Sequence, residues 1–399
     1  MAALFIRGAR QLVTLRGPCP RRGAALSELS IIADGALLII DGRIEEVGSS
    51  RRIENLGKAR GADVLDCTGK VVLPGFVDSG ARLYGSGSAA SEAGDRRDGA
   101  ALRSASFRTL RLANRRWTHL SAAGGVTAFE ICSGYDLDPA AELKILRCAA
   151  ALNEDPIETI PVVQLRSDAR NRGALFARFQ EAAARVRARG LPVGSWEFDA
   201  DASAMRVQDA RQVLDEARRA GLPARVRSAA KPGQAAVRLA VEFGARSAVG
   251  LERLEGADLE LLAASDTAAL ILPGESFFEA RRPAAPARRL VDRGAALAVG
   301  SAFDPNAGST LSMPTVLALA CRELGLTFEE GLAAATINSA YVTGRSDRLG
   351  SLEPGKQGDV AIYDCGDYRE ILRHPGMNLC WATVRKGRII YQAPSPPRP

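Results

Sequence analysis

The sequence predicts an α/β protein in which a (β/α)8 TIM barrel is flanked by a composite β-sandwich domain built from both termini. From about Phe76 to Thr343, helical patterns alternate with short apolar runs, which is typical of a parallel sheet with right-handed crossovers. Roughly 270 residues with about eight such units match the size of a TIM barrel. We therefore place the barrel at residues 74–345, the β-sandwich at residues 1–73 and 346–395, and a disordered tail at residues 396–399.

The two ends of the chain carry strand patterns. The clearest is a hairpin signal, in which Gly35–Ile40 and Arg43–Gly48 flank the turn residues Asp41 and Gly42. The first 27 residues contain arginines but no acid, a feature of transit peptides. We interpret them instead as part of the fold, because they contain strand-like runs. The further terminal strand patterns are Leu4–Ile6, Gln11–Leu15, Ala62–Leu65, Val71–Gly75, Asp359–Asp364, Cys380–Val384 and Arg388–Tyr391.

In the middle of the chain, the predicted helices and strands follow one another in the order that a barrel requires. The predicted helices are Arg103–Ala122, Ala140–Leu152, Ala174–Arg189, Ala204–Ala220, Gly233–Phe243, Ala287–Arg293, Ser312–Leu324 and Thr327–Ala335. The predicted strands are Val126–Ile131, Thr159–Val163, Ala224–Arg227, Ala268–Leu272 and Leu297–Val299.

Composition excludes several classes of protein. The 53 basic residues exceed the 46 acidic ones, but the arginines are spread along the chain and few aromatic residues lie among them, so we expect no nucleic-acid partner. No apolar run approaches the roughly 20 residues of a membrane-spanning helix. The seven cysteines form no Cys-x-x-Cys pair and are odd in number. This pattern favours neither a zinc module nor a disulfide framework, and it indicates a reduced, cytoplasmic location.

Histidine is scarce. The chain has only His119 and His374, which are few for a hydrolase that holds a divalent metal with imidazoles. His119 falls in a predicted helix and His374 in the predicted β domain, so we expect both side chains to be structural or exposed.

Five segments of the chain carry recognisable motifs: Val71–Asp78, Gly124–Tyr135, Leu272–Phe278, Thr310–Pro314 and Leu349–Asp359. Through them the chain resembles the amidohydrolase superfamily along nearly its whole length. The Ser-Gly-Tyr and Leu-Ser-Met-Pro stretches point more narrowly to the imidazolonepropionase family, hydrolases of histidine breakdown. The resemblance implies a TIM barrel with a composite β domain, and a homodimer.

The resemblance also implies one zinc or iron ion near the carboxyl ends of the barrel strands. The family holds this ion with a His-x-His pair on the first strand, a histidine on a middle strand and an aspartate on the last strand. The metal lowers the pKa of its bound water, and the resulting hydroxide attacks the ring carbonyl of the imidazolone.

Carried over residue by residue, the resemblance implies that these ligands are replaced. The first-strand pair falls at Gly80 and Arg82, and the middle-strand histidine at Arg227. The catalytic glutamate falls at Ala230, a neighbouring histidine at Gly250 and the last-strand aspartate at Ala302. A substrate-contacting histidine and arginine of the family fall at about Ser167 and Ala89. A substrate-contacting tyrosine is retained as Tyr135.

Arginine cannot act as a metal ligand, because the guanidinium group keeps its proton and has no lone pair to donate. Arg82 and Arg227 would lie where the metal belongs, and a buried arginine needs an acidic partner. The expected partners are Asp78, Glu130 and Asp304. We therefore predict no cofactor.

These replacements predict a pseudoenzyme. In one hypothesis the pocket binds a small anion, because guanidinium groups favour carboxylate or phosphate, or the protein acts as a regulatory scaffold. In another hypothesis the chain has decayed and has no specific function. The alternative is an active hydrolase of cyclic C–N bonds, with Glu130, Cys132 and Asp304 as a new metal site or with Cys132 as nucleophile. The candidate ligand-binding residues are Arg82, Glu130, Cys132, Tyr135, Arg227 and Asp304.

Overall fold

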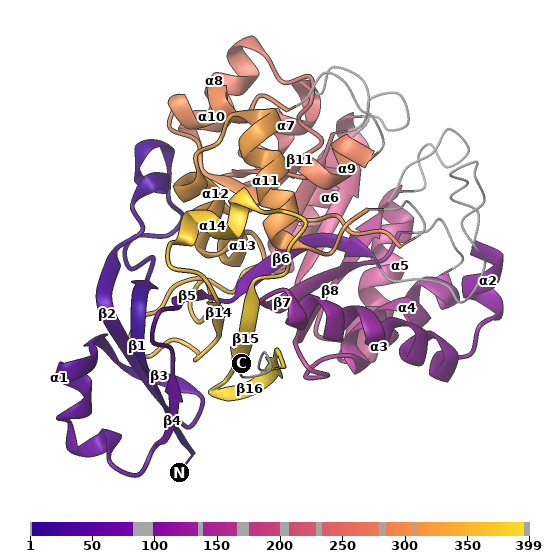
Figure 1. Ribbon diagram of the computed structural model, residues 1–399. Coiled ribbons are helices and arrows are strands. Elements are labelled where there is room, and N and C mark those ends of the chain that lie inside the picture. The colour runs from indigo at the N-terminus through magenta and orange to yellow at the C-terminus, as the bar shows by residue number, and fades with distance from the viewer. Residues whose placement is uncertain are drawn as a thin grey trace.

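The computed structural model contains two sheets of eight strands each, one forming a barrel and the other built from both termini (Figure 1). It describes residues 2–82, 99–134, 139–165, 175–199, 207–228, 234–278, 285–305 and 309–394. The predicted fold class, a TIM barrel with a composite β domain, is confirmed.

The barrel strands are parallel and lie side by side in chain order. The first and last strands meet through contacts at their carboxyl ends, where the amide nitrogen of Arg82 donates to the carbonyl oxygen of Phe303 at 2.7 Å. The barrel strands are β6 (Phe76–Arg82), β7 (Val126–Cys132), β8 (Glu158–Leu165), β9 (Ser195–Asp199), β10 (Ala224–Arg227), β11 (Ser247–Val249), β12 (Ala268–Ile271) and β13 (Leu297–Val299).

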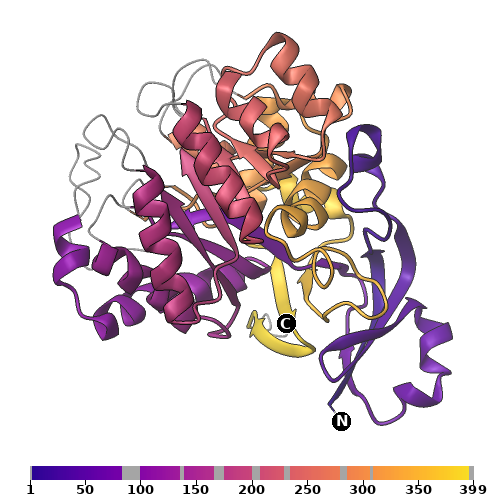
Figure 2. The same cartoon turned by 180° about the vertical axis from the view of Figure 1, so that it is seen from behind.

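Helices surround the barrel, as Figures 1 and 2 show. Their ends follow local signals: in α11 the Ser312 hydroxyl accepts a hydrogen bond from the Thr315 amide, and Gly325 ends the helix in the left-handed conformation. Helix α1 (Ser50–Glu54) lies instead beside the sheet built from both termini. The other helices are α2 (Gly99–Ser104), α3 (Phe107–Ala123), α4 (Pro139–Ala151), α5 (Leu175–Ala188), α6 (Val207–Arg219), α7 (Gln234–Glu242), α8 (Gly256–Ala264), α9 (Pro273–Phe278), α10 (Ala287–Asp292), α11 (Met313–Leu324), α12 (Phe328–Ala335), α13 (Ile337–Val342) and α14 (Tyr368–Arg373).

The second sheet joins the two termini. Its order is β16-β15-β14-β5-β1-β2-β3, with β4 paired to β1, so the pairing of β14 with β5 connects C-terminal and N-terminal strands. Apolar side chains such as Leu12, Val72 and Ile362 are fully buried in a cluster of their own. The strands are β1 (Ala3–Val13), β2 (Ile31–Ile40), β3 (Arg43–Ser49), β4 (Asp63–Asp66), β5 (Val71–Pro74), β14 (Val360–Tyr363), β15 (Cys380–Arg385) and β16 (Arg388–Gln392).

Two predictions for the N-terminal region are confirmed. β2 and β3 form the expected hairpin, in which Ile40 pairs with Arg43. Both turn residues have positive φ, +47° at Asp41 and +83° at Gly42, and this is what a two-residue hairpin with the right twist requires. The arginine-containing start of the chain is part of the sheet, because β1 pairs with β2, β4 and β5.

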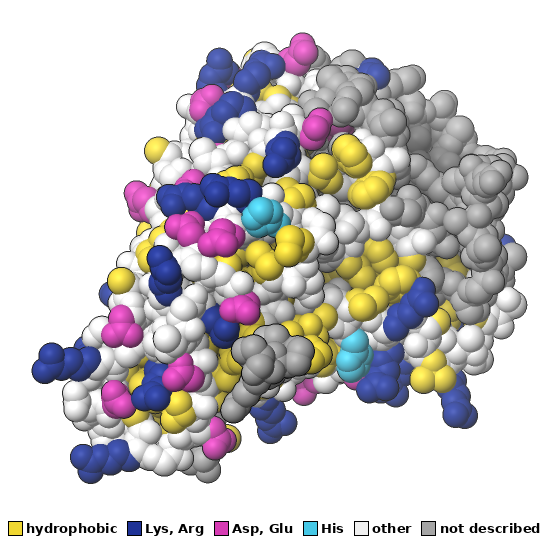
Figure 3. All heavy atoms as spheres, in the orientation of Figure 1, with side chains coloured by type: hydrophobic (Ala, Val, Ile, Leu, Met, Phe, Trp, Pro, Cys, Tyr) yellow, Lys and Arg dark blue, Asp and Glu magenta, His cyan; other side chains and the backbone are white. Residues whose placement is uncertain are grey.

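On the face shown in Figure 3, basic and acidic side chains lie among one another. Both histidines are exposed, as expected; His119 Nε2 lies 3.2 Å from Asp155 Oδ1. All seven cysteines are free thiols. Within the described ranges, no helix has both the length and the apolar character needed to cross a bilayer.

Candidate functional site

The carboxyl halves of the barrel strands bring arginine and glutamate side chains together in the barrel interior. In TIM barrels this end of the strands carries the functional sites. Alternation along a strand places residues two apart on the same face, so Arg225 and Arg227 of β10 both point inward. They meet Glu130 of β7 and Glu197 of β9.

Arg225 is the most deeply buried cation of this group, with 1% of its side chain exposed. Its Nη2 donates to both carboxylate oxygens of Glu130, at 2.8 Å and 3.0 Å, and its Nη1 lies 3.5 Å from Glu197 Oε2. Its Nε donates to the Ser247 hydroxyl at 3.1 Å. Both glutamates are fully buried. Arg225 therefore joins two carboxylates that belong to different strands.

Arg227 lies closer to the mouth of the barrel. Its Nε donates to Glu197 Oε1 at 2.6 Å, and its Nη1 lies 3.6 Å from Glu275 Oε2 on α9. The exposed fractions are 13% for the Arg227 side chain and 20% for that of Glu275. This arginine thus connects the barrel interior to the helix that follows β12.

Gln164 of β8 links Arg82 to this group. Its Oε1 accepts a 2.8 Å hydrogen bond from Arg82 Nη2, and its Nε2 donates to Glu197 Oε1 at 2.5 Å. A continuous set of contacts therefore involves β6, β7, β8, β9, β10 and α9. We refer to it as the mouth network, which consists of Arg82, Glu130, Gln164, Glu197, Arg225, Arg227 and Glu275.

The electrostatics of the mouth network favour the ionised forms. Burial by itself raises the pKa of Glu197, but the charges of Arg227 and Arg225 outweigh it and lower the pKa to about 2. Burial likewise opposes the charge on Arg225 and Arg227, and their glutamate partners still raise both pKa values. The mouth network contains three arginines and three glutamates.

Asp78 lies apart from the arginines. It is fully buried on β6, where its Oδ1 accepts from the Ser301 amide and its Oδ2 from the Ser301 hydroxyl, both at 2.7 Å. Burial raises its pKa to about 7 even though these hydrogen bonds act in the opposite direction. Asp78 therefore joins the first barrel strand to the segment after the last.

Cys132 ends β7 beside the mouth network and is buried. Burial, together with the charges of Glu197 and Glu130, raises the pKa of its thiol to about 12. A nucleophilic cysteine must be a thiolate, and this one is protonated at neutral pH. The structure therefore argues against the hypothesis that Cys132 is a nucleophile.

The partners expected for Arg227 require a correction. Asp78, Glu130 and Asp304 are the acids that the sequence predicts, whereas Arg227 forms ion pairs with Glu197 and Glu275. Glu130 binds a different arginine, Arg225. Asp78 engages Ser301, and Asp304 follows β13, where its amide donates to the Ser309 hydroxyl at 2.7 Å.

Sequence reasoning missed Glu197, Arg225 and Gln164. Glu197 lies on β9, which has no counterpart among the predicted strands, and its signal would have been the alternation Trp196-Glu197-Phe198. Arg225 lies two residues before Arg227, at the spacing that shares a strand face. Gln164 follows a predicted strand directly, and nothing in its neighbours marks it as a link between charged groups.

The backbone at three of the positions where the resemblance implies a replaced residue also departs from an ordinary strand. Gly80 has φ +80°, and the register between β6 and β7 shifts between Asp78 and Ala81. Ala302 has φ +49°. Gly250 has φ +78°, and a Cβ atom there would lie 2.0 Å from the carbonyl oxygen of Ser228. A larger residue at Gly250 would require the backbone to move.

The donor set does not fit the metal that the resemblance implies. Gly80 and Ala302 offer no side-chain donor, and arginine at positions 82 and 227 has no lone pair. Within the described ranges, no three His, Cys, Asp or Glu residues are arranged to hold a metal ion, so Glu130, Cys132 and Asp304 do not form the alternative site. Ala230, Tyr135, Ser167 and Ala89 lie outside the described residues.

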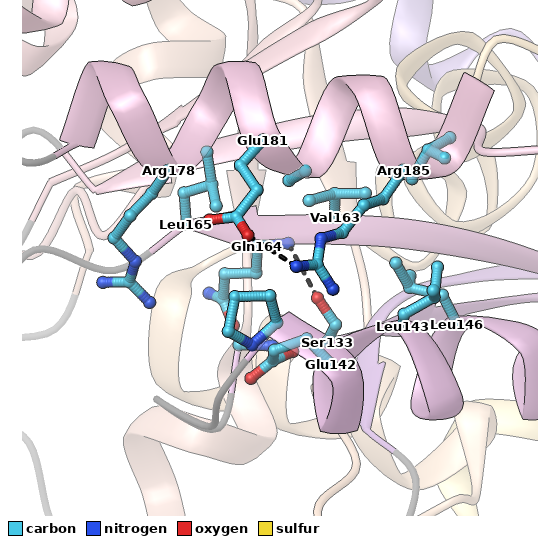
Figure 4. A pocket seen from close by; sticks show the side chains of 14 residues that line it. Ser133, Glu142, Leu143, Leu146, Val163, Gln164, Leu165, Arg178, Glu181 and Arg185 are labelled. Atoms are coloured by element: carbon cyan, nitrogen blue, oxygen red, sulfur yellow. Dashed lines mark hydrogen bonds and ion pairs between the residues drawn. The ribbon is translucent and has the colours of Figure 1, made fainter. Parts of the chain in front are cut away.

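A pocket lies between α4 and α5 (Figure 4), and Gln164 of the mouth network is one of its lining residues. Leu143, Leu146 and Val163 form its apolar part, and Arg178, Glu181 and Arg185 project over it from α5. Arg185 Nη2 donates to Glu181 Oε1 at 2.6 Å. None of the predicted site residues lines this pocket.

Comparisons with known proteins agree with this architecture. The model of the amidohydrolase family matches residues 149–391. Imidazolonepropionase of Geobacillus sp. (strain WCH70) is 31% identical, and that of Solibacter usitatus (strain Ellin6076) is 34% identical; each alignment covers 98% of this chain and 99% of the relative. Among solved structures, E. coli guanine deaminase has a TM-score of 0.75 at 14% identity and covers 99% of this chain and 100% of its own.

The fold and these matches define an amidohydrolase: the chain belongs to the amidohydrolase family. Within that family it is related over its full length to imidazolonepropionases, at 31–34% identity for the two relatives above. The likeness to guanine deaminase concerns the fold alone.

Proposed function

We propose that this chain is an imidazolonepropionase-related protein that has lost the catalytic metal and, with it, hydrolytic activity. The observation that carries the proposal is the position of Arg82 and Arg227. By resemblance these residues replace two of the histidine ligands, and in the structure both belong to the mouth network. A guanidinium group repels a dication and cannot bind one.

The loss of the metal removes the nucleophile of the family reaction. That reaction needs a metal to generate hydroxide from water at neutral pH. In this chain Glu130 and Glu197, the buried carboxylates nearest the arginines, accept hydrogen bonds from guanidinium groups. Neither is therefore free to activate water, and the Cys132 thiol is protonated.

We further propose that the barrel mouth serves a small anionic ligand in a regulatory homodimer. Arg82 and Arg227, with Tyr135 and Asp304, are the residues we assign to ligand binding. Glu130 and Cys132, which were also candidates, are fully enclosed, so we assign them to the support of the site. A thermal-shift series with dicarboxylates and phosphate tests this, and no rise in midpoint with any of them would contradict it.

The first test of the main proposal is metal content together with activity. Protein purified without a histidine tag, then incubated with zinc or iron and dialysed, is analysed by elemental mass spectrometry. We expect close to zero metal per chain, no turnover of imidazolone propionate and no change in thermal midpoint with a chelator. One tightly bound metal per chain would overturn the proposal.

A second candidate function is the hydrolysis of a cyclic C–N bond, as in histidine degradation. The identity of 31–34% to imidazolonepropionases over 98% of the chain favours it. It predicts turnover of imidazolone propionate that a chelator abolishes. Absence of turnover in the presence of added zinc, iron or manganese would dismiss it.

A further inference from the structure

We propose that Glu130 and Glu197 form an internal cation site whose occupant is the chain's own Arg225. In this view the chain supplies, from its own sequence, the cation that the two buried carboxylates require. The inference rests on the proposed absence of metal, and it adds a specific residue to which nothing in the resemblance gives a role.

The geometry around Arg225 is that of a complete binding site. Three of its nitrogen atoms have acceptors: Glu130 for Nη2, Glu197 for Nη1 and the Ser247 hydroxyl for Nε. The side chains of Arg225, Glu130 and Glu197 are exposed by 1%, 0% and 0%. Water thus has little access to any of the three charges.

The charges require such an occupant. Burying a carboxylate without a cation is costly, because the interior replaces little of the solvation that water provides. Glu197 also forms an ion pair with Arg227. Among the described residues, the ion pair of Glu130 is with Arg225. Glu130 Oε2 also accepts a 3.3 Å hydrogen bond from the amide of Gly80. Arg225 is therefore the cation on which Glu130 depends.

The position of Arg225 also explains how it acts on the fold. β9 and β8 lie between β10 and β7 in the barrel sheet, so the contact from Arg225 to Glu130 crosses the interior past two strands. Backbone hydrogen bonds join only adjacent strands. Like a bound ion, Arg225 connects strands that the ladder leaves unconnected.

The test removes the internal cation and offers an external one. We expect Arg225→Ala to lower the thermal midpoint by about 10 °C or more, because two buried carboxylates then share one fewer cation. Guanidinium chloride at low millimolar concentration, far below denaturing levels, should restore part of this loss, whereas sodium chloride at equal ionic strength should not. The wild-type protein should show no rise with either salt.

A matched control is Arg238→Ala, which removes an arginine that is 60% exposed from a single buried carboxylate, Asp258. Water can reach that site, so we expect a smaller loss and no recovery with guanidinium. An Arg225→Ala midpoint within about 2 °C of the wild type, or equal recovery in both variants, would overturn the inference.

If Arg225→Ala does not fold, the double variant Glu130→Gln, Arg225→Met provides the readout. Removing both members of a buried ion pair costs less than removing one member, and Glu197 keeps Arg227 as its cation, so the double variant should fold and unfold cooperatively. Failure of the double variant as well would contradict the inference. Metal bound by the wild-type protein would instead refute the proposed function, so the two failures are distinguishable.

Discussion

Asp78 and Ser301 form two hydrogen bonds of 2.7 Å, one to the Ser301 amide and one to its hydroxyl, and they do so inside the barrel with both side chains fully buried. Asp78 lies on β6, and Ser301 follows β13. This pair therefore connects β6 and the segment after β13, at the two ends of the barrel sheet.

The Asp78 pair makes the stability of the protein depend on pH in the neutral range. The folded pKa of about 7 lies above the ordinary value of 3.8, so the folded state binds the proton more tightly. The resulting stabilisation is fully present below about pH 4 and is lost as the pH rises through about 7, with an upper bound of about 4 kcal/mol.

Urea unfolding at about pH 5 and about pH 8 measures this effect. We expect the free energy of unfolding of the wild type, relative to Asp78→Asn, to be higher at the acidic pH. The comparison with Asp78→Asn cancels the contributions of the groups that both proteins share. A difference between wild type and variant that does not change with pH would show that Asp78 titrates normally.

Replacing Glu197 should be strongly destabilising. Glu197→Gln removes the negative charge shared by Arg225 and Arg227, so we expect a loss of about 3–5 kcal/mol in the free energy of unfolding. The matched control is Glu181→Gln, since Glu181 forms an exposed ion pair with Arg185, and its effect should stay within about 1 kcal/mol. Equal losses in the two variants would contradict a special role of the buried pair.

Glu197 should become protonated only in strong acid. Its pKa falls from 4.5 to about 2 in the folded state, so its contribution to stability is present above about pH 4.5 and is lost as the pH falls through about 2. We expect Glu197→Gln to flatten the acid limb of the pH–stability curve, measured by circular dichroism. An acid limb that coincides with that of the wild type would argue against this assignment.

The loss of stability on replacing a glycine by alanine should depend on the backbone conformation of the glycine and on the space around it. Gly80→Ala meets no atom closer than 3.5 Å but has φ +80°, so we expect a loss of about 1–2 kcal/mol. Gly250→Ala adds a 2.0 Å contact with the Ser228 carbonyl and should cost more. Gly57 has nothing within 4 Å and no positive φ, so Gly57→Ala should change stability by less than about 0.5 kcal/mol. A different rank order in denaturant unfolding would refute this account.

Thiol labelling should distinguish Cys132 from the partly buried cysteines. Cys132 is buried, so we expect it to remain unmodified by iodoacetamide in the folded protein. Cys19 and Cys321 are partly exposed and should react first, as peptide mass spectrometry can show. Rapid alkylation of Cys132 would indicate an accessible thiolate and would support the hypothesis that Cys132 is a nucleophile.

Much of the fold could be predicted because it is specified by local patterns. Asp41 and Gly42 adopt positive φ within one turn, and α11 starts and ends at its own capping residues. β9 could not be predicted with the same ease. It is five residues long with a central glutamate, and a short strand with a charged residue lacks the apolar run that marks a buried strand.

The candidate site could be predicted only in part. The sequence places arginine at positions 82 and 227, and it follows from the chemistry of guanidinium that these residues cannot hold a metal. The partners of the arginines could not be predicted, because they lie far away in the sequence. Arg225 and Glu130 are 95 residues apart, and Arg227 reaches Glu197 and Glu275 on two other elements.

By itself, then, the sequence determined the α/β class, the hairpin and the residue types at the strand ends, since these depend on local periodicity, turn conformation and side-chain chemistry. Only the tertiary structure decided which acid neutralises which arginine. That choice depends on barrel closure, which brings side chains from β7, β9 and β10 within hydrogen-bond distance in an interior that excludes water. In such an interior every buried charge must find its partner among the few groups that the fold places beside it.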